Sequence, residues 1–143
     1  VHARSKKDGY KPPAYWHYIG EISKSYSMDI IANGEIWNKA DANQCMQESD
    51  TDMLMLGRGA LAMPNLANII TKNEQPMPFE LVKTLLHRFS LHPENSSPYY
   101  FSSRLKQWLK YLKLQYPEAE LLFEIIKKTS DKNEILTAIN NRV

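Results

Sequence analysis

The sequence predicts an α/β first half followed by an all-α second half. Short apolar runs alternate with segments of helical period as far as Lys72, which is typical of strands and helices in succession. The polar connector NEQPMP then interrupts the pattern, and every later segment from Phe79 to Val143 has helical period. We therefore expect one module at residues 1–75 and a second at residues 76–143.

The composition is that of a globular, water-soluble chain. Its 143 residues are 43% hydrophobic and 24% charged, which is enough to bury a core. The net charge of +2 does not by itself select nucleic acid over another partner. A single cysteine, Cys45, excludes a disulfide within the chain, and no apolar run approaches the roughly 20 residues that cross a bilayer. We expect a cytoplasmic protein with no membrane segment.

The first residues are typical of a strand that ends in a charged loop. Val1–Arg4 has no initiator Met and leads into SKKDGY, so we expect the chain to be a piece of a longer protein. The turn residues Asp8-Gly9 and Pro12-Pro13 then precede a predicted helix at about Pro13–Tyr26, whose apolar residues Trp16, Ile19 and Ile22 recur at helical spacing.

Two short apolar runs, Met28–Ala32 and Met53–Leu56, are predicted as strands covered on both faces, as in parallel sheets. The helix between them is expected to begin at Asn38 or Lys39. Its apolar side would carry Ala42, Cys45 and Met46. The segment MPNLANIITKN predicts a third helix with Pro64 close to its N-terminus.

The second half predicts a small helical bundle. Breaks are expected at the segment Pro93–Pro98, at Pro117, and near Ser130 or Asp131, either of which can cap the last helix. The predicted helices are Phe79–Ser90, Tyr99–Tyr116, Pro117–Lys128 and Asp131–Asn140.

Glycine follows both predicted strands, at Asn33-Gly34-Glu35 and at Gly57-Arg58-Gly59. In a strand–helix barrel the loops after the last two strands commonly bind phosphate, because glycine lets the backbone approach an anion. Either glycine alone is explained by a tight turn, but two in adjacent repeats favour a phosphate site, with Arg58 as an additional cation.

Four motifs in order, VHARSKKDGY, PPAYWHYIGEI, IIANGEIW and MLGRGALAMPNL, resemble the tRNA-dihydrouridine synthases, above all their C-type bacterial subfamily. The resemblance is strongest over Val1–Leu66, and RLKQWLKYL in the second half is also similar. It implies the last strand–helix units of a TIM (β/α)8 barrel, starting in the sixth strand, followed by a helical bundle domain that binds tRNA.

The resemblance also implies a reaction, the reduction of uridine to 5,6-dihydrouridine in the tRNA D-loop at position 16, with FMN and NADPH. It assigns His2 to the flavin, places Arg4 beside the tRNA, and assigns the flavin phosphate to Asn33, Gly34, Glu35, Gly57 and Arg58. The sequence departs from the family in having Glu35 where many members have Asp, and Ala3 where Gly is frequent.

No catalytic residue is expected in this chain. In the family, the cysteine that protonates the uracil lies in an earlier part of the barrel, so we expect the chain alone to be inactive. Cys45 is not a substitute, because its predicted helix should bury it against the sheet. His17, His87 and His92 lack the spacing of metal ligands, and no metal is expected.

Basic residues interleave with an apolar stripe in SSRLKQWLKYLK. The basic residues are Arg104, Lys106, Lys110 and Lys113, and the stripe is Leu105, Trp108, Leu109 and Leu112. A solvated face over an ordinary core and a surface for RNA phosphates both fit this pattern. With tRNA as the implied substrate, we favour the second interpretation.

Two other functions stay open. The chain could be a non-catalytic RNA-binding module, or part of another phosphate-binding barrel enzyme. Three strand–helix units would also leave open sheet edges, which predicts pairing with the remainder of the same enzyme or self-association.

Overall fold

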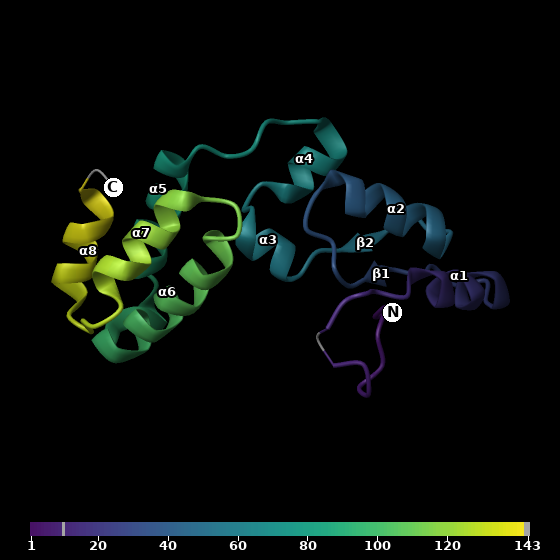
Figure 1. Ribbon diagram of the computed structural model, residues 1–143, viewed down its shortest axis with the longest axis horizontal. Helices are drawn as coiled ribbons and strands as arrows, with labels where there is room; N and C mark the ends of the chain where they lie inside the picture. Colours follow the sequence, from purple (N-terminus) through teal and green to yellow (C-terminus); the bar gives the residue numbers. More distant parts are fainter. Residues whose placement is uncertain (10, 142–143) are drawn as a thin grey trace. The chain divides into compact units, whose positions relative to one another are not determined.

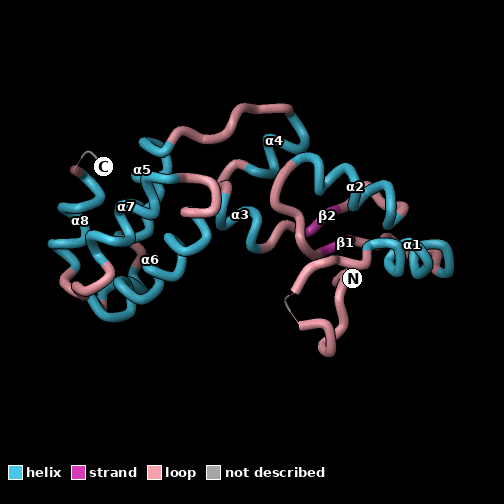
Figure 2. Tube along the Cα trace, viewed as in Figure 1, coloured by secondary structure: helices cyan, strands magenta, loops and turns pink. Residues whose placement is uncertain are grey.

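A computed structural model describes residues 1–9 and 11–141 of the chain. They form two compact units, Val1–Ala60 with Asn65–Pro76, and Leu61–Pro64 with the chain from Met77 onward. The first unit combines strands with helices and the second is helical (Figures 1 and 2). The sequence-derived boundary at residue 76 lies next to Met77, while the roles given to the two modules stay predictions.

A small parallel sheet forms the centre of the first unit. Strand β1 (Ala32–Asn33) pairs with β2 (Leu54–Met55), with Asn33 opposite Met55. On its other side, β1 meets the start of the chain, where His2 forms a parallel bridge with Asn33 and the Asn33 N–H donates to the Val1 carbonyl at 2.9 Å. The carboxyl ends of three parallel segments therefore lie at one edge of the sheet.

The two strands are shorter than predicted, and β1 begins at the residue where the predicted strand Met28–Ala32 ends. The prediction that both faces are covered is wrong for this unit. Ile30 and Ala32 are buried, but Ile31 is 46% exposed and Met55 is 57% exposed. This alternation is that of a sheet packed on one face only, because successive side chains of a strand point to opposite faces.

Helices α1 (Trp16–Ser25) and α2 (Lys39–Ser49) pack with the buried face of the sheet. Helix α1 begins three residues later than predicted, because the non-helical Tyr15 donates its N–H to the Ala3 carbonyl at 2.8 Å. Helix α2 begins as predicted, with Asn38 as its cap. The shared core consists mainly of Trp16, Ile19, Ile30, Ala32, Ile36, Ala42 and Cys45.

The predicted third helix corresponds to α4 (Leu66–Lys72), which follows a turn that contains Pro64. The short helix α3 (Arg58–Ala62), directly before that turn, was not predicted. Helix α3 begins directly after Gly57. Its Gly59 packs so closely that a Cβ built on it would lie 2.0 Å from the Ile36 carbonyl oxygen. Only glycine fits at this position.

The second unit contains the four predicted helices and a short 3-10 helix, η1 (Pro93–Ser96), that was not predicted. Helix α6 ends four residues before Tyr116, which is extended as expected for a residue that precedes proline. Asp131 caps the last helix, accepting the Glu134 N–H at 2.8 Å. The helices are α5 (Phe79–Ser90), α6 (Pro98–Leu112), α7 (Pro117–Ile126) and α8 (Lys132–Asn140). None of the described helices has the length and apolar content needed to cross a bilayer.

Candidate functional site

The structure brings together three charged side chains from the segments that follow the carboxyl edge of the sheet. Arg4 follows the start of the chain, Glu35 follows β1 and Arg58 follows β2. Arg4 Nη2 donates to Glu35 Oε1 at 2.5 Å, and Arg58 Nη2 donates to the same oxygen. Two guanidinium groups and one carboxylate give this Arg4–Glu35–Arg58 cluster a net positive charge.

Exposure increases across the cluster. The side chain of Arg4 is 0% exposed, that of Glu35 16% and that of Arg58 31%. Within the described residues, Nε and Nη1 of Arg4 are buried and have no hydrogen-bond partner. Arg58 is therefore the cation of the cluster that a dissolved anion reaches most readily, and Arg4 is its buried end.

The loop conformation directs the Glu35 carboxylate toward the arginines. Gly34 has φ +124° and Glu35 has φ +53°, so two successive residues adopt positive φ. Trp37 Nε1 donates to Glu35 Oε2 at 2.9 Å. Burial alone raises the pKa of Glu35, but the Trp37 hydrogen bond, together with Arg4 and Arg58, holds this pKa below its ordinary value of 4.5. Glu35 is consequently ionised at neutral pH.

The two glycines predicted to approach a phosphate differ in their surroundings. A Cβ at Gly57 would have nothing within 4 Å, so the backbone there is open to a ligand. Gly34 is buried, a Cβ on it would lie 3.3 Å from Ala3 Cβ, and its carbonyl accepts the Trp16 Nε1–H at 2.8 Å. The open Gly57 backbone and the net positive charge both fit a phosphate group.

His2 and Asn33 lie at the same edge of the sheet. The Arg4 N–H donates to His2 Nδ1 at 3.2 Å, and Asn33 Nδ2 donates to the Met55 carbonyl at 3.2 Å. His2 is exposed, which leaves its ring accessible. Their assignment to the flavin stays a prediction.

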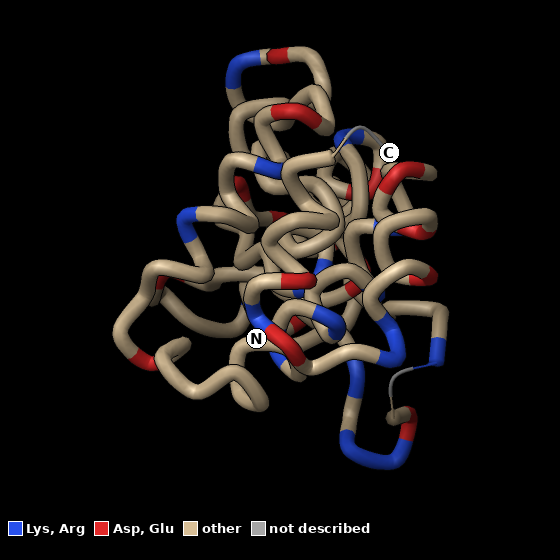
Figure 3. The backbone as a smooth tube through the Cα atoms, turned by 90° about the vertical axis from the view of Figure 1, so that its left-hand side faces the viewer, with Lys and Arg blue, Asp and Glu red and all other residues tan. Residues whose placement is uncertain are grey.

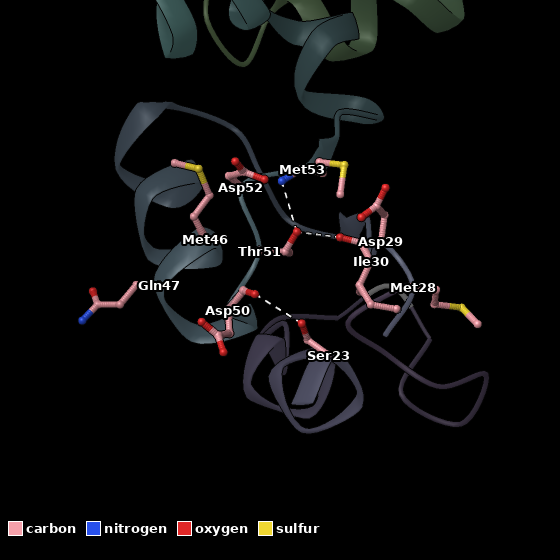
Figure 4. Close-up of a pocket in the computed structure, with 10 residues that line it drawn as sticks. All are labelled: Ser23, Met28, Asp29, Ile30, Met46, Gln47, Asp50, Thr51, Asp52 and Met53. Carbon is pink, nitrogen blue, oxygen red and sulfur yellow. Dashed lines mark hydrogen bonds between the residues drawn. The ribbon is translucent and has the colours of Figure 1, made fainter. Parts of the chain in front are cut away.

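The first unit also has a cleft of about 620 Å³ at the amino ends of β1 and β2 (Figure 4). Thr51 connects its walls, donating from Oγ1 to the Ile30 carbonyl at 2.6 Å. Its lining includes the acidic residues Asp29, Asp50 and Asp52. Because carboxylates repel phosphate, this cleft does not compete with the carboxyl edge as a phosphate site.

In the second unit, the basic residues predicted to contact tRNA lie on α6, with Lys113 directly after its last residue. Lys106, Lys110 and Lys113 share one face at helical spacing, while Arg104 lies on another flank beside the Tyr100 ring, 5.3 Å away. Lys110 and Arg104 are exposed. Figure 3 shows basic and acidic positions interspersed along the backbone, so charge alone does not outline an RNA surface.

Two of these lysines make contacts within the second unit. Lys106 Nζ donates to the Thr129 carbonyl at 2.6 Å, and Lys113 Nζ pairs with Glu120 at 3.0 Å. The predicted apolar stripe is confirmed, because Leu105, Leu109 and Leu112 are fully buried and Trp108 Nε1 donates to the Leu61 carbonyl. The tRNA assignments of the four basic residues stay predictions.

Cys45 packs in the core of the first unit, as predicted. Its side chain is inaccessible, and burial raises the pKa of its thiol. Among the described residues, no three His, Cys, Asp or Glu side chains gather as metal ligands would.

Sequence reasoning missed Trp37 as a residue of the site. Its ring lies 5.4 Å from the Arg58 guanidinium, and its indole N–H reaches Glu35. The sequence feature that could have indicated Trp37 is its position two residues after Glu35 in a glycine-containing loop, where its indole N–H can donate a hydrogen bond to the Glu35 carboxylate. Sequence reasoning also missed the close packing of Gly59 against the Ile36 carbonyl.

Comparison with known proteins gives a family match over the whole chain. The family model described as dihydrouridine synthase (Dus) matches residues 1–143. A relative from Shewanella oneidensis named tRNA-dihydrouridine(16) synthase is 42% identical over 140 residues, which cover 97% of this chain and 44% of the relative. Relatives with the same name from Yersinia pestis and Escherichia coli (strain K12) are 42% and 40% identical, over 97% of this chain and 45% of each relative. The chain thus spans less than half the length of the curated relatives it matches.

Proposed function

Because the chain belongs to the dihydrouridine synthase family, we propose that it is the part of a tRNA-dihydrouridine synthase that binds the flavin phosphate and contacts tRNA. The reaction is the reduction of uridine to 5,6-dihydrouridine in the D-loop, at the position 16 that the relatives' names carry, with FMN and NADPH. The observation that carries this proposal is the positively charged cluster at the carboxyl edge of the sheet, beside the open backbone of Gly57.

The proposed cofactor contacts fall into two groups, those with the phosphate and those with the rest of the flavin. Arg58 and the Gly57 backbone bind the phosphate, because a guanidinium and backbone N–H groups are good phosphate donors. His2 and Asn33 lie at the same edge, close enough to each other to contact one ligand. When bound, FMN supplies the hydride that uridine accepts. The burial of Cys45 supports the view that the proton donor lies outside this chain.

We propose further that the first unit forms the last strand–helix units of a TIM (β/α)8 barrel. The parallel order of the start of the chain, β1 and β2 supports this, as does the meeting of their carboxyl ends, where such barrels bind ligands. The outer edges of these segments would pair with the remainder of the same enzyme, or with a second copy. A cytoplasmic location agrees with the single buried cysteine.

The second unit is proposed to bind the tRNA backbone through α6. The exposure of Lys110 and Arg104 supports direct contacts. Lys106 and Lys113 belong to the same proposed surface, although each also makes a contact within the unit.

The test is the full-length protein with tRNA that lacks dihydrouridine. We expect the purified protein to show flavin absorbance and, with NADPH, to form dihydrouridine at position 16, measured by mass spectrometry of tRNA fragments. Flavin without tRNA reduction would favour another phosphate-binding barrel enzyme. Salt-sensitive tRNA binding without flavin would favour the RNA-binding module, and either result would overturn the proposal.

A further inference from the structure

Two neighbours restrain the guanidinium of Arg58. Its Nη2 donates to Glu35 Oε1, and the group lies over the Trp37 ring at 5.4 Å. Arginine is a long side chain that loses rotamer freedom whenever it binds a ligand. Contacts made before the ligand arrives reduce that loss, so they favour binding by holding the donor in place.

Glu35 and Trp37 are themselves held. Trp37 Nε1 donates to Glu35 Oε2, while Arg4, fully buried, donates to Oε1. Both carboxylate oxygens are thus engaged, and the backbone of Glu35 is fixed at φ +53°. The contacts run from the buried Arg4, through Glu35, to the partly exposed Arg58.

We propose that Glu35 and Trp37, held by Arg4, are positioning residues that orient the Arg58 guanidinium for the phosphate group of the flavin. This inference rests on the proposed function, because it takes the FMN phosphate as the anion. It gives Glu35 a role other than direct contact, since a carboxylate beside a phosphate repels it. It also gives Arg4, whose side chain is inaccessible, a role that needs no contact with tRNA.

For Glu35→Gln, the proposal predicts a change in phosphate affinity opposite in sign to the change that simple electrostatics predicts. If Glu35 acted only through its charge, Glu35→Gln would remove a negative charge near the anion, and phosphate binding would tighten. If Glu35 positions Arg58, the same substitution weakens the contact that orients the guanidinium, and phosphate binding weakens with it. Glutamine keeps nearly the same shape, so the two outcomes differ through charge and hydrogen bonding alone.

The experiment compares dissociation constants for FMN and for riboflavin, which lacks the phosphate, by flavin fluorescence with the full-length apoprotein. We expect Glu35→Gln to weaken FMN binding about tenfold, the effect of one lost charge-assisted hydrogen bond, and to leave riboflavin binding unchanged. Arg58→Ala should produce a similar loss, and the double variant Glu35→Gln/Arg58→Ala should lose little more, because the two residues act as one unit.

Two further variants keep the test decisive. Trp37→Phe retains a ring beneath Arg58 but removes the donor to Glu35, so it should weaken FMN binding by a smaller factor and serves if Glu35→Gln does not fold. Glu21→Gln, at an exposed position on α1, is the matched control and should change neither constant.

FMN binding that is unchanged or tighter in a folded Glu35→Gln variant would overturn the inference, as would an equal loss for FMN and riboflavin. If Glu35→Gln does not fold, unchanged FMN binding in Trp37→Phe overturns it. If the unmodified protein binds both flavins equally, or binds neither, the phosphate site of the proposed function fails, and the inference fails with it. If the unmodified protein prefers FMN and the ratio of the two dissociation constants is the same in Glu35→Gln, only the inference fails.

Discussion

At the scale of single residues, Glu35 makes the stability of the first unit depend on pH. Its pKa is lower in the folded chain than the ordinary 4.5, because the hydrogen bond from Trp37 and the two arginines outweigh the effect of burial. Its stabilising contribution is therefore fully present above the unfolded-state pKa and is lost as pH falls through the folded-state pKa. We expect the free energy of unfolding to decrease more steeply in the unmodified protein than in Glu35→Gln from about pH 6 to about pH 3.

The measurement is urea unfolding at a series of pH values. Asp8, whose pKa is also lowered, by hydrogen bonds from Ser5, contributes equally to both proteins and cancels in the difference. Identical pH dependences in the two proteins would show that Glu35 carries no such linkage.

Gly57 and Gly59, two residues apart, differ in their tolerance of a side chain. A Cβ at position 59 would lie 2.0 Å from the Ile36 carbonyl oxygen, whereas one at position 57 would meet nothing within 4 Å. We expect Gly59→Ala to destabilise the fold by about 1–3 kcal/mol or more, the usual effect of overpacking. Gly57→Ala should change stability little, as measured by urea unfolding. Similar losses in both variants would contradict the distinction.

At the scale of elements, the start of α2 depends on one side chain. Asn38 Oδ1 accepts the Asp41 N–H at 2.9 Å, which satisfies a donor that the helix leaves unpaired. Asn38→Ala should therefore lower the free energy of unfolding by about 1 kcal/mol. Asn43→Ala, at an exposed position inside the same helix, is the control and should have little effect or stabilise slightly. Thermal unfolding of both variants checks this, and an equal response would argue against the cap.

Helix α5 was predicted to the residue, because Pro78 precedes a strongly amphipathic segment and both signals are local. The lengths of the strands were not predicted correctly. The length of a strand depends on how many residues of its neighbour pair with it, and β1 pairs with β2 over only two residues. Helix α3 was missed because it has only five residues and contains Gly59, whose place depends on a contact with Ile36, distant in the sequence.

The same limit applies to the candidate site. Glycine after each strand predicted the two loops and named Arg58 from local sequence alone. The pairing of Glu35 with Arg4, 31 residues away, and with Arg58, 23 residues away, follows from the order of the sheet. No local spacing in the sequence encodes this pairing. Glu35 and Arg4 were assigned to the site only through the family resemblance, and neither the local pattern nor the resemblance predicted that their side chains contact each other.

At the scale of the whole molecule, the proposed function divides between the two units, with the flavin phosphate in the first and tRNA in the second. The basic residues of α6 should therefore not be equivalent. Lys106 donates to the Thr129 carbonyl and has a structural contact to lose, whereas Lys110 is exposed. Substitution at position 110 should test RNA binding with little effect on folding.

We expect Lys110→Ala to weaken tRNA binding by the full-length protein and to lower by about 1 the slope of log Kd against log salt concentration, because one phosphate contact is lost. Lys106→Ala should in addition destabilise the fold by about 0.5–1.5 kcal/mol, the net worth of a hydrogen bond. Binding isotherms across a salt series and urea unfolding separate the two effects. Lys24→Ala, exposed on α1 of the first unit, is the control. An unchanged slope in Lys110→Ala would remove this residue from the RNA surface, and a loss of the same size in Lys24→Ala would mean that the protein responds to its total charge rather than to α6.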